Sequence, residues 1–259
     1  YMFYVQDDWK IAERLTLNLG LRYELTSPMF DTQNRMTTLD LASFPTIKVI
    51  HAGDNGNSWS SRGLIDTDTN NWAPRLGLAY QPAERWTIRA GAGLFYGTTG
   101  GGLGASARLT NNWPNYREVT VPSTPTRSAG QLADGLEAEI LGDPTRMPAN
   151  LNWNVWSPDF QVPTIVQGNV SVQRQIARAL VLTASYVGSS SRNLPRSYNI
   201  NGAYLGDPRT ERQRRPNPNL GAVTFRDPSA RARYNGLELT LDKRLSGGTQ
   251  FSLAYTWSR

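Results

Sequence analysis

The sequence predicts an all-β chain, an antiparallel up-and-down transmembrane β-barrel segment of about eight strands in four hairpins. Apolar and polar residues alternate over runs of about ten residues, a pattern typical of a strand with one apolar and one polar face. These runs occur in pairs joined by turns of a few residues. Long polar segments separate the pairs, and alternating short and long connections are typical of outer-membrane barrels.

The composition agrees with strands that expose only one face to lipid. The mean hydropathy is −0.48, and no segment has the roughly 18 consecutive apolar residues that a membrane helix needs. In a barrel strand only every second residue faces lipid, so a low mean hydropathy is compatible with a membrane wall. The chain has no cysteine, which excludes disulfides and cysteine-based metal sites and nucleophiles.

The four expected hairpins follow one another along the chain. In order, they pair Phe3–Trp9 with Leu15–Glu24, Pro74–Gln81 with Trp86–Tyr96, Val166–Gln175 with Leu180–Gly188, and Asn235–Lys243 with Thr249–Trp257. The second strand of each hairpin has the clearest alternation. Short turns are expected at 10–14, 82–85, 176–179 and 245–248.

The alternation assigns each residue to a face. The residues expected to face lipid are Leu15, Leu17, Leu19, Leu21, Leu76, Leu78, Ile88, Leu94, Val170, Val172, Leu180, Leu182, Leu237, Leu239, Leu241, Phe251 and Leu253. The polar residues expected to face the lumen are Asn18, Arg22, Glu24, Arg75, Arg89, Asn169, Gln173, Glu238 and Asp242. Charges fall almost wholly on this second face, which a hydrated lumen accepts and a closed apolar core rejects.

Aromatic residues are expected to form two girdles at the membrane interfaces. Trp9, Tyr80 and Trp86 flank short turns, while Tyr23, Tyr96, Tyr186, Tyr255 and Trp257 lie toward the other strand ends. Rings at both ends of an apolar band are typical of transmembrane barrels. The alternative is that these rings pack against loops in a soluble β protein.

Three long connections separate the hairpins, at about Leu25–Asn71, Gly97–Pro163 and Ser189–Arg233. In outer-membrane barrels the outside loops are long and the periplasmic turns short, so the four short turns are expected to face the periplasm. A short helix is expected at Gln131–Leu141, with Gly142 as its C-terminal cap. The chain begins and stops inside strand-like runs, so it is expected to be a piece of a longer protein.

Tyr4–Lys10 followed by Leu15–Glu24 resembles a strand pair of TonB-dependent outer-membrane receptors. Further segments resemble the Oar-like branch of that family: Ala73–Tyr80, Arg89–Tyr96, Asn169–Gln175, Ala184–Ser189, Tyr234–Leu237 and Tyr255–Ser258. The resemblance spans nearly the whole chain in order. It implies a barrel of roughly 22 strands, of which residues 1–259 would be a partial barrel domain without the plug and N-terminal regions. It also implies a TonB energy-coupling complex as a partner through the missing N-terminal part, while the solute stays unknown.

Motifs for catalysis or cofactors are absent or incomplete, so no catalytic, cofactor-binding or metal-binding residue is expected. His51 is the only histidine, which excludes multi-histidine metal sites. Asp66–Asn70 resembles the start of a calcium loop, but Asn71 replaces the required glycine and Gly77 the closing glutamate, so a polar turn is favoured over a loose calcium site. Gly100–Ala105 fits a dinucleotide fingerprint loosely, but no amphipathic helix follows it, so a loop tip is favoured.

The net charge of +6 includes a basic segment, Arg209–Arg215, in the third long connection. No nucleic-acid-binding module surrounds it, so a nucleic acid is not an expected partner. The segment is interpreted as a solvated loop, with binding of lipopolysaccharide phosphates or an anionic solute as the alternative.

Three function classes follow from these patterns. The first is a non-enzymatic TonB-dependent receptor in the outer membrane of a Gram-negative bacterium, which contacts outer-membrane lipid and lipopolysaccharide and imports a solute bound at its outer loops and lumen. The second is a small outer-membrane β-barrel enzyme. The third is an adhesion-type β protein with long binding loops.

Overall fold

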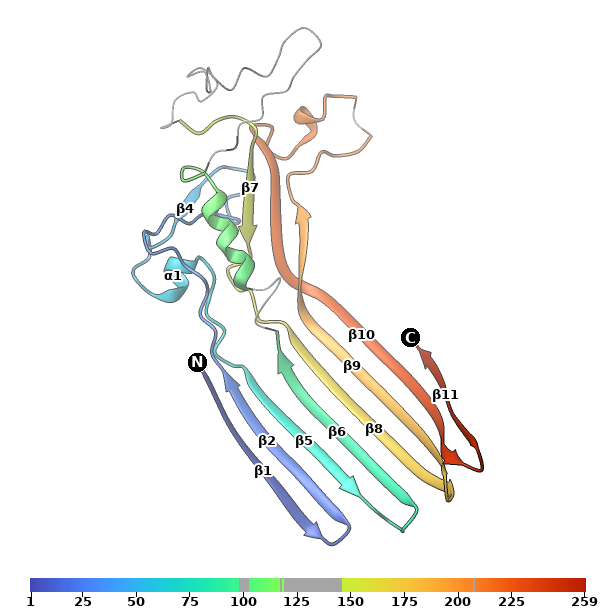
Figure 1. The fold of residues 1–259 in the computed structure, drawn as a ribbon. Coiled ribbons are helices and arrows are strands. Elements are labelled where there is room, and N and C mark those ends of the chain that lie inside the picture. The colour runs from blue at the N-terminus through green and yellow to red at the C-terminus, as the bar shows by residue number, and fades with distance from the viewer. Residues whose placement is uncertain (98–102, 117, 119–145, 207) are drawn as a thin grey trace, which may run out of the picture.

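The structure is a computed structural model that describes residues 1–97, 103–116, 118, 146–206 and 208–259. Its largest feature is an inclined wall of strands in the order β1-β2-β5-β6-β8-β9-β10-β11 (Figure 1). The bounds are β1 Met2–Ala12, β2 Leu15–Glu24, β5 Trp72–Tyr80, β6 Trp86–Tyr96, β8 Thr164–Ala177, β9 Leu180–Asn199, β10 Leu220–Ser246 and β11 Thr249–Ser258. Neighbours along this path are antiparallel, which confirms the predicted fold class.

All four predicted hairpins form, as β1–β2, β5–β6, β8–β9 and β10–β11. Their short turns lie at one end of the wall and the long connections at the other (Figure 1). The last of these turns is built from Gly247 and Gly248, whose φ angles are 60° and 73°. Two positive φ values in succession are those of a type I′ hairpin turn, and glycine adopts them without steric cost.

The third predicted long connection, 189–233, is wrong in extent. β9 continues to Asn199 and β10 begins at Leu220, so the connection covers residues 200–219. The added part of β9 carries serine, arginine and asparagine instead of an alternating apolar face, whereas the added part of β10 begins with residues of the outer-loop core, Leu220 and Val223. Register shifts at Asp227/Ala230 and Ala230/Ala232 also interrupt the period of two.

The long connections fold into an outer-loop domain that was not predicted. It contains β3 Thr37–Leu39 paired with β4 Val49–His51, α1 Trp59–Gly63, the 3₁₀ helices at Leu103–Asn111 and Arg212–Arg214, and β7 Leu151–Trp156. β7 pairs in parallel with the start of β10, above the level that β11 reaches (Figure 1). Among the described residues, no helix is both long and apolar enough to span a membrane. The predicted helix at Gln131–Leu141 lies outside the described residues.

The buried core lies in the outer-loop domain and not in the wall. One cluster gathers Met36, Ile65, Trp156, Phe160 and Val162 around Leu109 and Ala52. A second gathers Leu39, Trp153, Val155, Leu220 and Val223. This core was not predicted, because apolar residues spread over three distant segments meet only in the folded chain.

The short turns are displaced stepwise along the strand direction. Leu15 at the first turn pairs with Tyr80, and Tyr80 with Ile88. Trp86, the first residue of β6, lies two residues closer to the short turn than Ile88 and pairs with Arg174. β8 continues beyond Arg174 to Ala177. β10 in turn continues past Lys243, the partner of Leu180, to Ser246.

This displacement amounts to roughly one residue per strand, or about 3.3 Å across an inter-strand spacing of about 4.8 Å, which corresponds to a strand tilt of about 35°. That is the tilt of a barrel wall.

Candidate functional site

The register places every residue predicted to face lipid on one side of the wall, which we call the apolar face. Opposed residues in an antiparallel ladder share a side. One row across the wall consists of Trp9, Leu17, Leu78, Ala90, Val170, Tyr186, Leu237 and Trp257. Leu76 and Leu253 are 59% and 61% exposed, so apolar side chains cover an open surface several strands wide. Its contact with lipid stays a prediction.

The opposite side, the polar face, carries all the residues predicted to face the lumen. Their side chains bond across strands: Asn18 Nδ2 donates to Asp8 at 2.5 Å, and Ser252 Oγ donates to Asp242 at 2.7 Å. Arg22 forms an ion pair with Glu24 at 2.8 Å on the same strand. Glu24 is buried at the base of the outer-loop domain.

The expectation that charges lie almost wholly on the polar face has exceptions, which include Arg192 and Arg233 nearer the outer loops and three residues closer to the short turns or on the edge strand. Arg174 and Lys243 lie on the apolar face beside short turns, opposite Leu182 and Leu180. A long side chain at such a position can reach the level of lipid headgroups, and the Arg174 guanidinium lies 4.8 Å from the centre of the Trp86 ring. Asp7 lies opposite Leu19 on the edge strand β1.

All eight predicted girdle aromatics lie on the apolar face. Toward the outer loops, the hydroxyl group of Tyr23 donates to the carbonyl of Thr69 at 2.9 Å, and that of Tyr96 to the carbonyl of Trp72 at 3.3 Å. Trp72 was not predicted as a girdle residue, yet its ring centre lies 4.6 Å from that of Tyr23. The location of these rings at a membrane interface stays a prediction.

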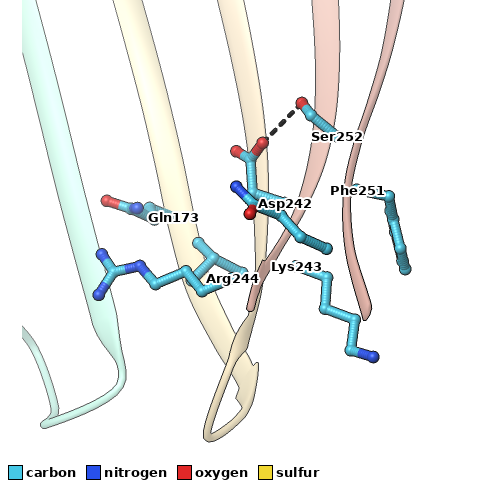
Figure 2. Close-up of a pocket in the computed structure, with 8 residues that line it drawn as sticks. Gln173, Asp242, Lys243, Arg244, Phe251 and Ser252 are labelled. Carbon is cyan, nitrogen blue, oxygen red and sulfur yellow. Dashed lines mark hydrogen bonds between the residues drawn. The ribbon is translucent and has the colours of Figure 1, made fainter. Parts of the chain in front are cut away.

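The polar face is hollowed near the short turns of β8–β11. A cavity of about 520 Å³ is lined there by Gln173, Asp242, Arg244 and Ser252. Figure 2 shows Gln173 and Arg244 extending to one side, with Lys243 and Phe251 on the other, as alternation along a strand requires. Gln173 and Arg244 also line an adjoining hollow with Arg85 and Arg178, so this end of the polar face is cationic.

A larger cavity of about 640 Å³ lies in the outer-loop domain, between the segments 41–45 and 200–216; we call it the basic pocket. Its walls are Leu41, Phe44, Pro45, Ile200, Tyr204, Arg209, Gln213, Arg214, Arg215 and Pro216. Three arginines of the predicted basic segment thus meet two aromatic rings. A short 3₁₀ helix, Arg212–Arg214, lies within this segment and ends just before Arg215.

Hydrogen bonds to backbone carbonyls hold the arginines of the basic pocket in place. Arg214 Nη1 donates to the carbonyl of Tyr204 at 2.7 Å, and Arg215 Nη1 to that of Leu220 at 3.1 Å. Arg214 Nε is buried and has no hydrogen-bond partner among the described residues. Arg215 also pairs with Glu211 at 2.9 Å, and this hydrogen bond lowers the pKa of Glu211. Arg214 also lies near enough to Glu211 to lower its pKa further, so Glu211 partly balances the charge of both arginines.

The other sequence motifs have structural roles. Asp68, in the segment that resembles a calcium loop, accepts hydrogen bonds from the backbone N–H groups of Val162 at 3.0 Å and Asn70 at 3.3 Å. This agrees with the polar-turn interpretation. Within the described ranges no three His, Cys, Asp or Glu side chains form a metal-binding group. Gly100–Gly102 lie outside the described residues, and Leu103–Asn111 form a 3₁₀ helix.

Three comparisons place the fold among known proteins. The family model described as an outer membrane beta barrel domain matches residues 1–259. The FrpB iron transporter from Neisseria meningitidis aligns with a TM-score of 0.51 at 11% sequence identity, covering 99% of this chain and 25% of that chain. A mutant of the ferric enterobactin receptor PfeA from Pseudomonas aeruginosa aligns with a TM-score of 0.50 at 15% identity, covering 99% of this chain and 26% of that chain. This chain thus spans about a quarter of the length of either solved chain. No curated protein matches the sequence.

Proposed function

We propose, since the chain belongs to the outer membrane beta barrel domain family, that residues 1–259 form part of the wall and outer loops of a TonB-dependent receptor that binds a solute outside the cell and imports it. The family confirms the predicted location in the outer membrane of a Gram-negative bacterium. The names of the two solved structures, a transporter and a receptor, agree with the predicted absence of enzymatic activity. The proposal also includes further strands that complete the barrel, a plug domain and contact with TonB.

The main support for the proposal is that one chain forms both a wall with an apolar and a polar face and a folded outer-loop domain. A wall of tilted strands with one apolar and one polar face suits a barrel in lipid around a hydrated lumen. A domain with its own buried core at the loop end provides a rigid support for a binding pocket. Together they support capture of a solute outside the membrane, above the lumen.

The basic pocket is the proposed entry site, and its chemistry favours an anionic solute. Guanidinium groups held by backbone carbonyls are fixed donors, and they bind carboxylates and other anionic oxygens strongly. The rings of Phe44 and Tyr204 add flat apolar surface. Anionic metal chelates with aromatic or carboxylate ligands combine both properties.

The test uses the full-length receptor and three probes, ferric enterobactin, ferric citrate and an uncharged ferric trihydroxamate. Arg214→Ala should weaken binding of whichever anionic probe the wild-type protein binds by about tenfold or more, because it removes a pre-positioned charged donor. Arg212→Ala is the matched control, since Arg212 lies on the same turn, carries the same charge and is absent from the pocket wall. Binding is measured by calorimetry, and uptake in cells with and without TonB.

Two outcomes contradict the proposal. Equal effects of Arg214→Ala and Arg212→Ala would show that only the net charge of the loop matters. Uptake that persists at the same rate without TonB would exclude an energy-coupled receptor.

A further inference from the structure

Two basic side chains interrupt the apolar face close to the short turns. Arg174 lies on β8 and Lys243 on β10, the two strands that flank β9. Arg174 is opposite Leu182 and Lys243 is opposite Leu180, so Lys243 lies two residues nearer the turns in the register. The turns themselves are displaced by roughly one residue per strand, or about two residues from β8 to β10. The two cations therefore lie at the same depth along the barrel axis.

The separation of the two residues allows both to contact one ligand. Two inter-strand spacings of about 4.8 Å and an offset of about 6.6 Å along the strands place their Cα atoms about 12 Å apart. The point midway between them lies over β9, about 6 Å from either Cα atom, which is within the reach of a lysine or an arginine side chain. A negatively charged group over β9 can therefore interact with Arg174 and Lys243 together.

No acidic side chain neutralises these two cations. The Arg174 guanidinium lies 4.8 Å from the centre of the Trp86 ring, and the Lys243 ammonium donates to the hydroxyl group of Thr249. Both of these partners are uncharged. In the part of the chain that the structure describes, no Asp or Glu forms an ion pair with either residue. Each cation therefore has N–H donors left for an anion.

The surroundings of the two cations are apolar. Figure 2 shows the Lys243 side chain beside Phe251, extending toward the short turn and away from Gln173 and Arg244. Leu182 and Phe251 are both exposed on this face. Since the short turns are expected to face the periplasm, the two cations lie at the level of the headgroups of the periplasmic leaflet. Lysine and arginine at that level attract anionic lipids.

These features select one class of ligand. A small soluble anion has no apolar part for the exposed leucine and phenylalanine side chains. A zwitterionic phospholipid brings an ammonium group, for which the two cations offer repulsion and no carboxylate. A phospholipid with a net negative charge satisfies both the cations and the apolar surface.

We propose that Arg174 and Lys243 bind an anionic phospholipid of the periplasmic leaflet. Its phosphate lies over β9 and accepts hydrogen bonds from the guanidinium and the ammonium group. Its acyl chains run along Leu182, Leu241 and Leu239 toward the middle of the bilayer. The site rests on the wall orientation included in the proposed function, but not on the solute, and the basic pocket takes no part in it.

The test measures lipid binding to the delipidated full-length protein by native mass spectrometry. Phosphatidylglycerol, cardiolipin, phosphatidylethanolamine and lipid A are titrated one at a time. We expect the first molecule of phosphatidylglycerol or cardiolipin to bind at least fivefold more tightly than phosphatidylethanolamine. The double variant Arg174→Gln/Lys243→Gln should lose this preference. Equal binding of the anionic and the zwitterionic phospholipid by the wild-type protein would overturn the proposal.

A matched double variant separates the site from the net charge. Arg178→Gln/Arg244→Gln removes the same charge near the same turns, but these residues line the hollow of the polar face. It should leave phosphatidylglycerol binding unchanged, and equal losses in the two double variants would contradict the site. Arg174→Lys/Lys243→Arg keeps both charges and should bind as the wild type does. The gel shift between unheated and heated samples confirms that each variant is folded.

Crosslinking locates the bound lipid. A phosphatidylglycerol with a diazirine in its headgroup should label residues 174–182 and 241–251 of the full-length protein in vesicles. Labelling around Arg192 and Arg233 instead, or tighter binding of lipid A that depends on Arg174 and Lys243, would place the ligand in the outer leaflet and overturn the proposal. Lipid binding at the expected residues without any uptake of a solute would contradict the proposed receptor function alone.

Discussion

Asn18 and Leu19, adjacent residues of β2, distinguish the two faces of the wall. Leu19 lies on the apolar face, opposite Leu76, whereas Asn18 lies on the polar face and is bonded to Asp8. Leu19→Arg should destabilise the full-length protein in lipid by about 2–4 kcal/mol if Leu19 faces the middle of the bilayer. Asn18→Arg should cost little, because arginine there enters a hydrated lumen and can pair with Asp8. Urea unfolding in lipid vesicles measures both, and equal losses would contradict the face assignment.

If the basic pocket binds an anion as proposed, the ion pair between Glu211 and Arg215 should make that binding dependent on pH. The hydrogen bond from Arg215 lowers the pKa of Glu211, so the pair's contribution is complete above the ordinary glutamate pKa and is lost as the pH falls through the lower, folded value. Protonation of Glu211 releases Arg215 for an anion. Glu211→Gln should therefore strengthen binding of the anionic chelate a few-fold at neutral pH and flatten its dependence on acidic pH relative to wild type. Binding is measured by calorimetry on both proteins over the same pH series. Protonation of the chelate affects both proteins equally, so it does not contribute to the difference between them. Weaker binding by the variant would contradict this role.

At the scale of elements, alternation predicted the strands that lie within the apolar band and missed those outside it. β2 and β6 alternate because successive side chains lie on the apolar and the polar face of the wall. In the outer halves of β9 and β10, apolar and polar residues do not alternate regularly. Their pairing, for example of Tyr234 with Ser189, could therefore not be predicted from the sequence. β7 was missed because its partner, the start of β10, is about 70 residues away and the pairing is parallel, which depends on tertiary structure.

The turn at Gly247 and Gly248 sets the register of the last hairpin. Both residues have positive φ, and no atom lies within 4 Å of a Cβ added to either, so the cost of substitution is one of backbone conformation alone. Gly247→Val should cost about 1–2 kcal/mol and slow folding into vesicles, whereas Gly247→Asn should cost less, because asparagine tolerates the left-handed region. Folding rates are followed by the gel shift between unheated and heated samples. Equal behaviour of the two variants would mean that the turn does not direct the hairpin.

Asn201 closes the connection between β9 and β10. Its buried amide donates to the carbonyls of Asn217, Leu220 and Gly221, and its oxygen accepts from the Asn217 N–H at 2.8 Å. Asn201→Leu removes its hydrogen bonds to the Gly221 carbonyl and from the Asn217 N–H, at about 1–3 kcal/mol for a buried group, whereas the Leu220 carbonyl keeps its bond from Arg215. Hydrogen exchange should accelerate over residues 200–219 and leave the wall, including β6, unchanged. Unchanged exchange in the connection would contradict the bridging role of Asn201.

At the scale of the molecule, the sequence identified one half of the basic pocket and not the other. The arginines at 209–215 lie close together in the sequence and were therefore recognised as a basic segment. Its aromatic partner Phe44 lies more than 150 positions earlier and joins it only through the fold.

The wall itself is open, because β1 and β11 are its two edges and do not pair with each other. Each edge has backbone N–H and C=O groups without strand partners, and lipid offers no hydrogen bonds to replace them. Residues 1–259 expressed alone should therefore fail to insert into vesicles as a heat-modifiable, protease-resistant barrel. The full-length protein, in which further strands would pair with both edges, is the control and should show both properties. A stable, heat-modifiable barrel formed by residues 1–259 alone would mean that β1 and β11 can close on each other, and the wall would then be a complete small barrel.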